Sequence, residues 1–149
     1  MSAPYRIMVW TGGAALLAAT LIDTLSVIGR HIGWPVHGSI ELIQAAVLVS
    51  GGLSLLSATL ANGHARVHFV LDRLSPTAKA LAERVCHGAT ATFFACMLIG
   101  SAWIAADLWG GHEQSELLGV SWAAMRAFAN LCLAITLAFL LAKAVRRAR

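Results

Sequence analysis

The sequence predicts an all-α integral membrane protein, a four-helix bundle whose helices all cross the bilayer. Two observations lead to this prediction. Hydrophobic residues make up 58% of the 149 residues and charged residues only 12%, which leaves too little polar surface for a soluble domain of this size. The hydrophobic residues are also gathered in four long runs. Lipid is therefore the expected solvent for most of the chain.

Each of the four runs is long enough to cross a bilayer as a helix. A helix needs about 20 mostly apolar residues to span the hydrocarbon core, and backbone groups in lipid must pair within their own segment. The first run is too long for the apolar part of a signal peptide, and we interpret it as a span. We expect one membrane domain over residues 1–149, with spans at about 7–28, 40–61, 85–106 and 122–142.

The charges outside the spans predict the orientation of the bundle. With four spans, the N-terminus, the second connection and the C-terminal tail lie on one side of the membrane, and this side carries most of the basic residues. Lysine and arginine favour the cytoplasm, so we expect a bacterial inner-membrane protein with both termini cytoplasmic. The net charge of +4 follows from this pattern and does not indicate nucleic acid. The basic residues on this side are Arg6, Arg66, Arg73, Lys79, Arg84, Lys143, Arg146, Arg147 and Arg149.

The connection between spans two and three has a helical pattern of its own. Apolar residues recur at helical spacing from Val67 to Leu74, which predicts a short amphipathic helix at the cytoplasmic interface. Ser75 and Pro76 then form a helix start, with the serine as N-cap and the proline at the first helical position. The third long helix should therefore begin in the cytoplasm and exceed the thickness of the membrane.

Small residues recur at four-residue steps along the last three spans. Such stripes let helix backbones approach closely, which matters in lipid because hydrophobic burial does not drive helices together there. The stripes serve packing within this chain or, for at least one of them, docking onto a partner subunit. They are Ser50, Ser54 and Ala58 in span two, Gly88, Thr92, Cys96 and Gly100 in span three, and Asn130, Ala134, Ala138 and Ala142 in span four.

The sequence contains no catalytic constellation, so we expect no enzyme. It has no glycine-rich phosphate loop, nucleophile elbow or zinc-protease motif. Of the six histidines, only His87 lies near a span, which argues against haem held between facing helices. His64 and His68 could share one helical face, but they lack an evident third metal ligand. We therefore expect no cofactor and no metal.

Ionisable residues within the spans are few, and none lies near the middle of the bilayer. Asp23 lies near the outer end of span one, Glu41 opens span two, and Arg126 lies in the first turns of span four. A transporter that moves its own substrate usually places polar groups at mid-depth. The chain therefore has the features of an accessory subunit.

Asp23 and Arg126 carry opposite charges at comparable depth. A charge at that depth is costly without a partner, so one hypothesis is a direct ion pair that joins spans one and four. The alternatives are that each side chain extends to the interface or pairs with a larger subunit.

A set of ordered features runs through the whole chain. Arg30 follows span one, Glu41 opens span two, a basic stretch runs from Gly63-His64-Ala65-Arg66 to Ser75-Pro76, and Glu116–Trp122 precedes span four. This order resembles the small membrane subunit of tripartite ATP-independent periplasmic (TRAP) transporters. The chain departs from the family at His68, where an aspartate is usual, and a role that needs a carboxylate there does not carry over.

The resemblance implies a function within a larger assembly. In such a symporter a periplasmic substrate-binding protein captures an organic anion, and a large membrane subunit imports it with sodium. The small subunit is expected to brace the large subunit and to help dock the binding protein. The expected structural or interface residues are Asp23, Arg30, Glu41, His64, Arg66 and Arg126, and the expected docking residues are Arg30, His37, Glu113 and Glu116.

Two other functions stay open at this point. One is a haem- or quinone-associated membrane anchor of a redox complex, which an absorption spectrum would distinguish from a transporter subunit. The other is a small exporter that acts alone, which would require transport by this chain without partners.

Overall fold

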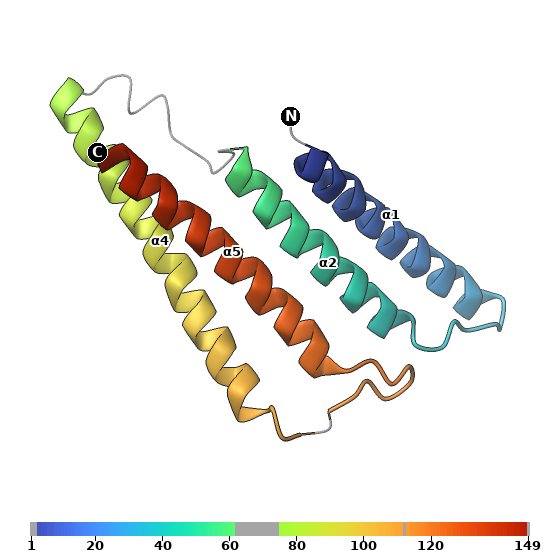
Figure 1. Cartoon of the computed structure of the whole chain (residues 1–149). Coiled ribbons are helices and arrows are strands. Elements are labelled where there is room, and N and C mark those ends of the chain that lie inside the picture. Colours follow the sequence, from blue (N-terminus) through green and yellow to red (C-terminus); the bar gives the residue numbers. More distant parts are fainter. Residues whose placement is uncertain (1–2, 62–74, 112, 149) are drawn as a thin grey trace.

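The computed structural model consists of long helices joined by connections (Figure 1). It describes residues 3–61, 75–111 and 113–148. The helices are α1 (Ala3–His31), α2 (Ser39–Leu60), α4 (Pro76–Asp107) and α5 (Trp122–Ala148). Each of these four contains a segment long and apolar enough to cross a membrane, so the predicted all-α membrane fold is confirmed. The amphipathic helix expected before Ser75 falls outside the described residues.

The helices pack side by side in an open row. Among the described residues, the main contacts join α1 to α2, α2 to α5, and α5 to α4. Figure 1 shows the loops that join α1 to α2 and α4 to α5 at one end of the row, and the two chain termini at the other. Among the described helices, α1 therefore packs mainly against α2, and α4 packs mainly against α5.

The tight turn after α1 depends on two glycines. Gly33 has a φ of +79°, in the left-handed region, and the Trp34 N–H donates to the Gly29 carbonyl at 2.7 Å, as in a Schellman motif. A Cβ on Gly29 would lie 2.3 Å from the Trp34 carbonyl oxygen. The chain therefore leaves α1 in a compact turn that leads directly to α2.

The start of α4 agrees with its sequence signal. The Ser75 Oγ accepts a hydrogen bond from the Ala78 N–H at 3.4 Å, and Pro76 follows as the first helical residue, which confirms the predicted cap. With 32 residues, α4 is about 48 Å long at the rise of an α-helix. It therefore exceeds a hydrocarbon core of about 30 Å.

Two glycines bring the central helices together. A Cβ on Gly12 would lie 3.4 Å from the Leu53 Cβ, where α1 meets α2. A Cβ on Gly52 would lie 2.9 Å from the Cys132 Sγ and 3.0 Å from the Phe128 Cε1, where α2 meets α5. Neither glycine belongs to the stripes identified in the sequence. The Cβ on Gly12 would also lie 3.6 Å from the Ser50 carbonyl oxygen and 3.8 Å from the Ser54 Oγ, so two residues of the span-two stripe do lie at the contact with α1.

The small-residue stripe of span three lies open. Gly88, Thr92, Cys96 and Gly100 are all exposed, and a Cβ on either glycine would meet nothing within 4 Å. We call these four residues the α4 stripe. In α2 the stripe residue Ser50 is buried, whereas Ala134, Ala138 and Ala142 of α5 are exposed. Residues 3–61, 75–111 and 113–148 therefore leave much of the small-residue surface uncovered.

Apolar side chains cover the outside of the row as well as its contacts. Leu17, Leu21, Phe93 and Ile99 are among many large apolar residues that are at least half exposed. Such a surface is stable only against lipid or another protein.

Candidate functional site

One end of the row carries most of the candidate residues. This loop end consists of the loop after α1, the loop before α5, and the helix turns beside them (Figure 1). Its candidates are Arg30 in the last turn of α1, His37 in the first loop, Glu41 in the first turn of α2, Glu113 and Glu116 in the second loop, and Arg126 near the start of α5. Asp23 lies exposed on α1, and His64 and Arg66 lie outside the described residues.

The second loop contains a tight turn over residues 115–120, the 115–120 turn. The Gly119 N–H donates to the Ser115 carbonyl at 3.1 Å, and the Ser115 N–H donates to the Val120 carbonyl at 2.9 Å. The Ser115 Oγ accepts from the Val120 N–H at 3.0 Å. Gly119 has a φ of +65°, which glycine adopts without strain. The turn is therefore fixed by its own hydrogen bonds.

Glu41 holds this turn against the start of α2. Its Oε1 accepts the Leu117 N–H at 3.0 Å, and its Oε2 accepts the Leu118 N–H at 2.8 Å. Hydrogen bonds from N–H groups to a carboxylate are stronger than those to a neutral acceptor. Both oxygens of one side chain are thus used in a contact between distant parts of the chain.

An apolar contact lies beside these hydrogen bonds. A Cβ on Gly38 would lie 2.9 Å from the Leu118 Cγ, and Gly38 has a φ of +73°. A larger residue at Gly38 would therefore be both strained and in collision with Leu118. The first loop, the start of α2 and the 115–120 turn form one connected unit.

Arg126 forms an ion pair with Glu113 in the second loop. Its Nη2 donates to the Glu113 Oε2, and the Trp122 N–H donates to the Glu113 carbonyl at 3.2 Å. Arg126 thus pairs with Glu113, and the hypothesised direct pair with Asp23 is not formed in the structure. The physical reason is the order of the row: α2 lies between α1 and α5, and the loop folds Glu113 back against Trp122 at the start of the helix that carries Arg126.

A buried hydrogen bond joins α1 to α2 near the same end. The Ser26 and Ser39 hydroxyls lie 2.9 Å apart, and both residues are buried. Neither serine was predicted as a candidate from the sequence, and neither were Ser115 and Gly38. A signal for the turn was present, because Ser115 precedes Gly119 by four residues and both are common turn residues. No local pattern in the sequence indicated which residue the Ser26 hydroxyl would bond to, because its partner lies on another helix.

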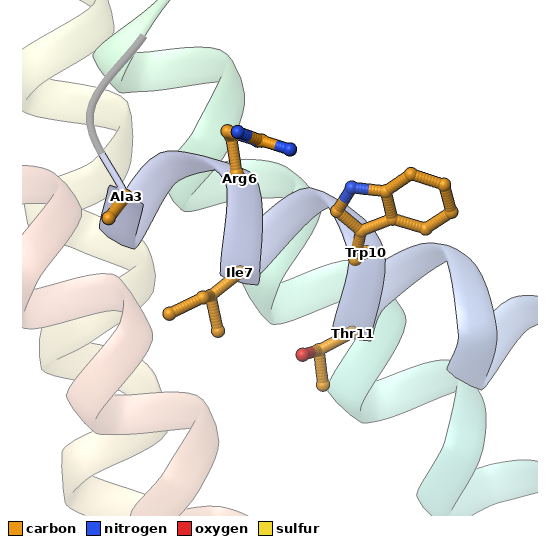
Figure 2. Close-up of a pocket in the computed structure, with 5 residues that line it drawn as sticks. All are labelled: Ala3, Arg6, Ile7, Trp10 and Thr11. Atoms are coloured by element: carbon orange, nitrogen blue, oxygen red, sulfur yellow. The ribbon is translucent and has the colours of Figure 1, made fainter.

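The described residues contain no group of three His, Cys, Asp or Glu side chains that could hold a metal ion. A hollow of about 430 Å³ lies at the start of α1, and Figure 2 shows Arg6 and Trp10 on one side of the helix with Ile7 and Thr11 on the other. All of its lining residues come from α1, so no second element converges on it, as a small-molecule site requires. Arginine and tryptophan near a helix end suit the headgroup region.

These features define a small polytopic membrane protein whose polar contacts fasten its loops to its helices. The family model described as "Tripartite ATP-independent periplasmic transporters, DctQ component" matches residues 19–149. The chain therefore belongs to this family, the small membrane component of TRAP transporters, and the resemblance expected from the sequence is confirmed. Family membership favours a transporter subunit over a redox anchor. The comparisons with curated proteins and with solved structures give no match.

Proposed function

We propose that this chain is a scaffold subunit that braces the large subunit of a sodium-coupled organic-anion importer and helps to dock its periplasmic binding protein. Membership of the TRAP family makes the chain one component of a tripartite transporter. The bracing role is supported by the open face of α4, and the docking role by the exposed residues of the loop end.

The observation that carries the bracing role is the exposed α4 stripe. Lipid can cover large apolar side chains as well as small ones, but only small residues let a neighbouring helix backbone approach closely. In α4 a smaller share of the described span is buried than in the other three helices. The stripe is therefore a helix-packing surface that the described part of the chain leaves uncovered, and the large subunit is the component that would cover it.

Leucine substitutions in the α4 stripe test this role. Gly88→Leu combined with Gly100→Leu adds side chains where the chain itself has nothing within 4 Å, and leucine favours a helix more than glycine does. The isolated variant should therefore remain as stable as the wild type. Overpacking at the interface should reduce recovery of the large subunit on the tagged chain by roughly tenfold or more.

The matched control for this experiment is Gly13→Leu. Gly13 of α1 also faces open space but does not lie in the α4 stripe. Its substitution should leave recovery of the large subunit unchanged. Equal recovery from the Gly88 and Gly100 variant would contradict bracing through α4.

The docking surface is proposed at the loop end. Arg30, His37 and Glu116 are exposed there, whereas Glu113 is engaged by Arg126. Leu117 is 65% exposed beside Glu116. The 115–120 turn thus offers a carboxylate and an apolar side chain to a soluble partner.

The docking role requires the loop end to face the periplasm and both termini to face the cytoplasm. The Lys/Arg asymmetry supports this orientation. In a chain whose native cysteines are replaced, cysteines at His37 and Glu116 should react with an impermeant thiol reagent in spheroplasts, and a cysteine at Thr77 should not. The reverse labelling pattern would invert the topology.

A further inference from the structure

We propose that Glu41 is a positioning residue that latches the 115–120 turn onto the start of α2, and thereby sets the orientation of the surface that meets the periplasmic binding protein. The latch is inferred from the geometry of the carboxylate. Its purpose rests on the docking function proposed above.

The two hydrogen bonds of Glu41 are suited to fix an orientation. Each carboxylate oxygen accepts from a different backbone N–H, at 3.0 Å from Leu117 and 2.8 Å from Leu118. Successive N–H groups that face one anion form a binding concavity in the backbone, and here the anion is a side chain from a residue 76 positions earlier than Leu117. A bidentate contact to neighbouring amides resists rotation of the turn more than a single bond would.

The position of Glu41 within α2 supports its role in holding the 115–120 turn. Gly38 is the N-cap of α2 and makes no side-chain cap hydrogen bond, so Glu41 occupies the third helical position. A glutamate there commonly bonds back to the N–H of its own N-cap. Glu41 instead directs both oxygens to another loop. Its carboxylate is therefore used to join two parts of the fold.

The 115–120 turn is attached to the start of α2 at two places, and other side chains of the turn are exposed. Leu118 contacts Gly38, which gives a second point of attachment next to the carboxylate. Glu116 is exposed, and Leu117 is exposed although its N–H is bonded to Glu41. The groups that fasten the turn and the groups that it displays are therefore different, so the latch can be removed without changing the displayed side chains.

The experiment compares Glu41→Gln with the wild type in the assembled transporter in lipid nanodiscs. Glutamine keeps the length of the side chain but replaces one acceptor with an N–H₂ donor, so one backbone N–H loses its partner. Hydrogen exchange at the Leu117 and Leu118 amides should become roughly tenfold faster, while amides in the middle of α2 stay unchanged. The binding-protein concentration that gives half-maximal uptake should rise roughly threefold or more, with the maximal rate retained.

Two further variants distinguish loss of the Glu41 hydrogen bonds from loss of its negative charge and from general loosening of the loop. Glu41→Asp keeps the charge but is one methylene shorter, so it should behave like Glu41→Gln. Glu113→Gln removes the Arg126 ion pair and should leave exchange at Leu117 and Leu118 unchanged. Unchanged exchange in Glu41→Gln, or wild-type behaviour of Glu41→Asp, would overturn the latch.

The docking function is tested separately by Glu116→Lys combined with Leu117→Asp, which alters only displayed side chains. If this variant changes the dependence on binding protein and Glu41→Gln does not, the positioning role of Glu41 fails and docking stands. If it leaves that dependence unchanged, docking at this surface fails whatever Glu41 does. Changes in both variants support the proposal.

Discussion

The contact between α1 and α2 and the α4 stripe both contain small residues, but the two regions use them differently. Gly12 lets Leu53 of the neighbouring helix approach closely, and the Ser26 and Ser39 hydroxyls meet at 2.9 Å nearer the loop end of the same interface. Gly88 and Gly100, by contrast, meet nothing within 4 Å. Small residues therefore indicate where a helix backbone can be approached, but they do not identify the approaching helix.

The largest expected effect on stability comes from a larger side chain at a glycine that already packs against a neighbouring helix. Gly52→Leu places a side chain where even a Cβ would lie 2.9 Å from the Cys132 Sγ, so α2 and α5 must separate or repack. We expect a loss of stability of about 1–3 kcal/mol. The adjacent Gly51 meets nothing within 4 Å, and Gly51→Leu should be neutral or slightly stabilising. Thermal unfolding in detergent measures both, and equal losses would remove the distinction between packed and open small residues.

A smaller effect is expected from the buried hydrogen bond between α1 and α2. Ser26→Ala leaves the Ser39 hydroxyl without its partner in a buried position, which should cost about 0.5–1.5 kcal/mol. Thr24→Ala is the control, because the Thr24 hydroxyl is exposed and bonds to the Thr20 carbonyl in its own helix. If both variants unfold at the same temperature, the serine pair does not contribute to this interface.

The smallest expected effect concerns the ion pair at the loop end. The Arg126 and Glu113 side chains are 24% and 44% exposed, so solvent and salt weaken their attraction. A double-mutant cycle of Arg126→Gln and Glu113→Gln should give a coupling of about 0.2–1 kcal/mol. The same cycle with Asp23→Asn in place of Glu113→Gln should give strictly additive losses. Measurable coupling to Asp23 would restore the hypothesis of an Asp23–Arg126 ion pair, which rests on their depth and charge.

The sequence by itself determined the elements of this protein and much of its identity. Four apolar runs specify four helices because a backbone in lipid must satisfy its hydrogen bonds within each segment. The start of α4 could be predicted from the sequence because Ser75 caps the helix that follows it directly and Pro76 is its first residue. The family could also be predicted from the sequence, since the order of its motifs along the chain is a property of the sequence itself. These properties depend on composition and on neighbours in sequence.

The tertiary structure alone decided which distant groups meet. Glu41 and Arg126 were identified as candidates from charge and depth, but their partners Leu117, Leu118 and Glu113 depend on the order of the helices in the row. The depth of a residue in the membrane fixes its position along the bilayer normal but not within the membrane plane. Asp23 and Arg126 can therefore lie at the same depth and still be separated by α2, which lies between their helices. Lateral order follows from which backbones approach most closely, as at Gly12 and Gly52, and such contacts join residues that no local pattern connects.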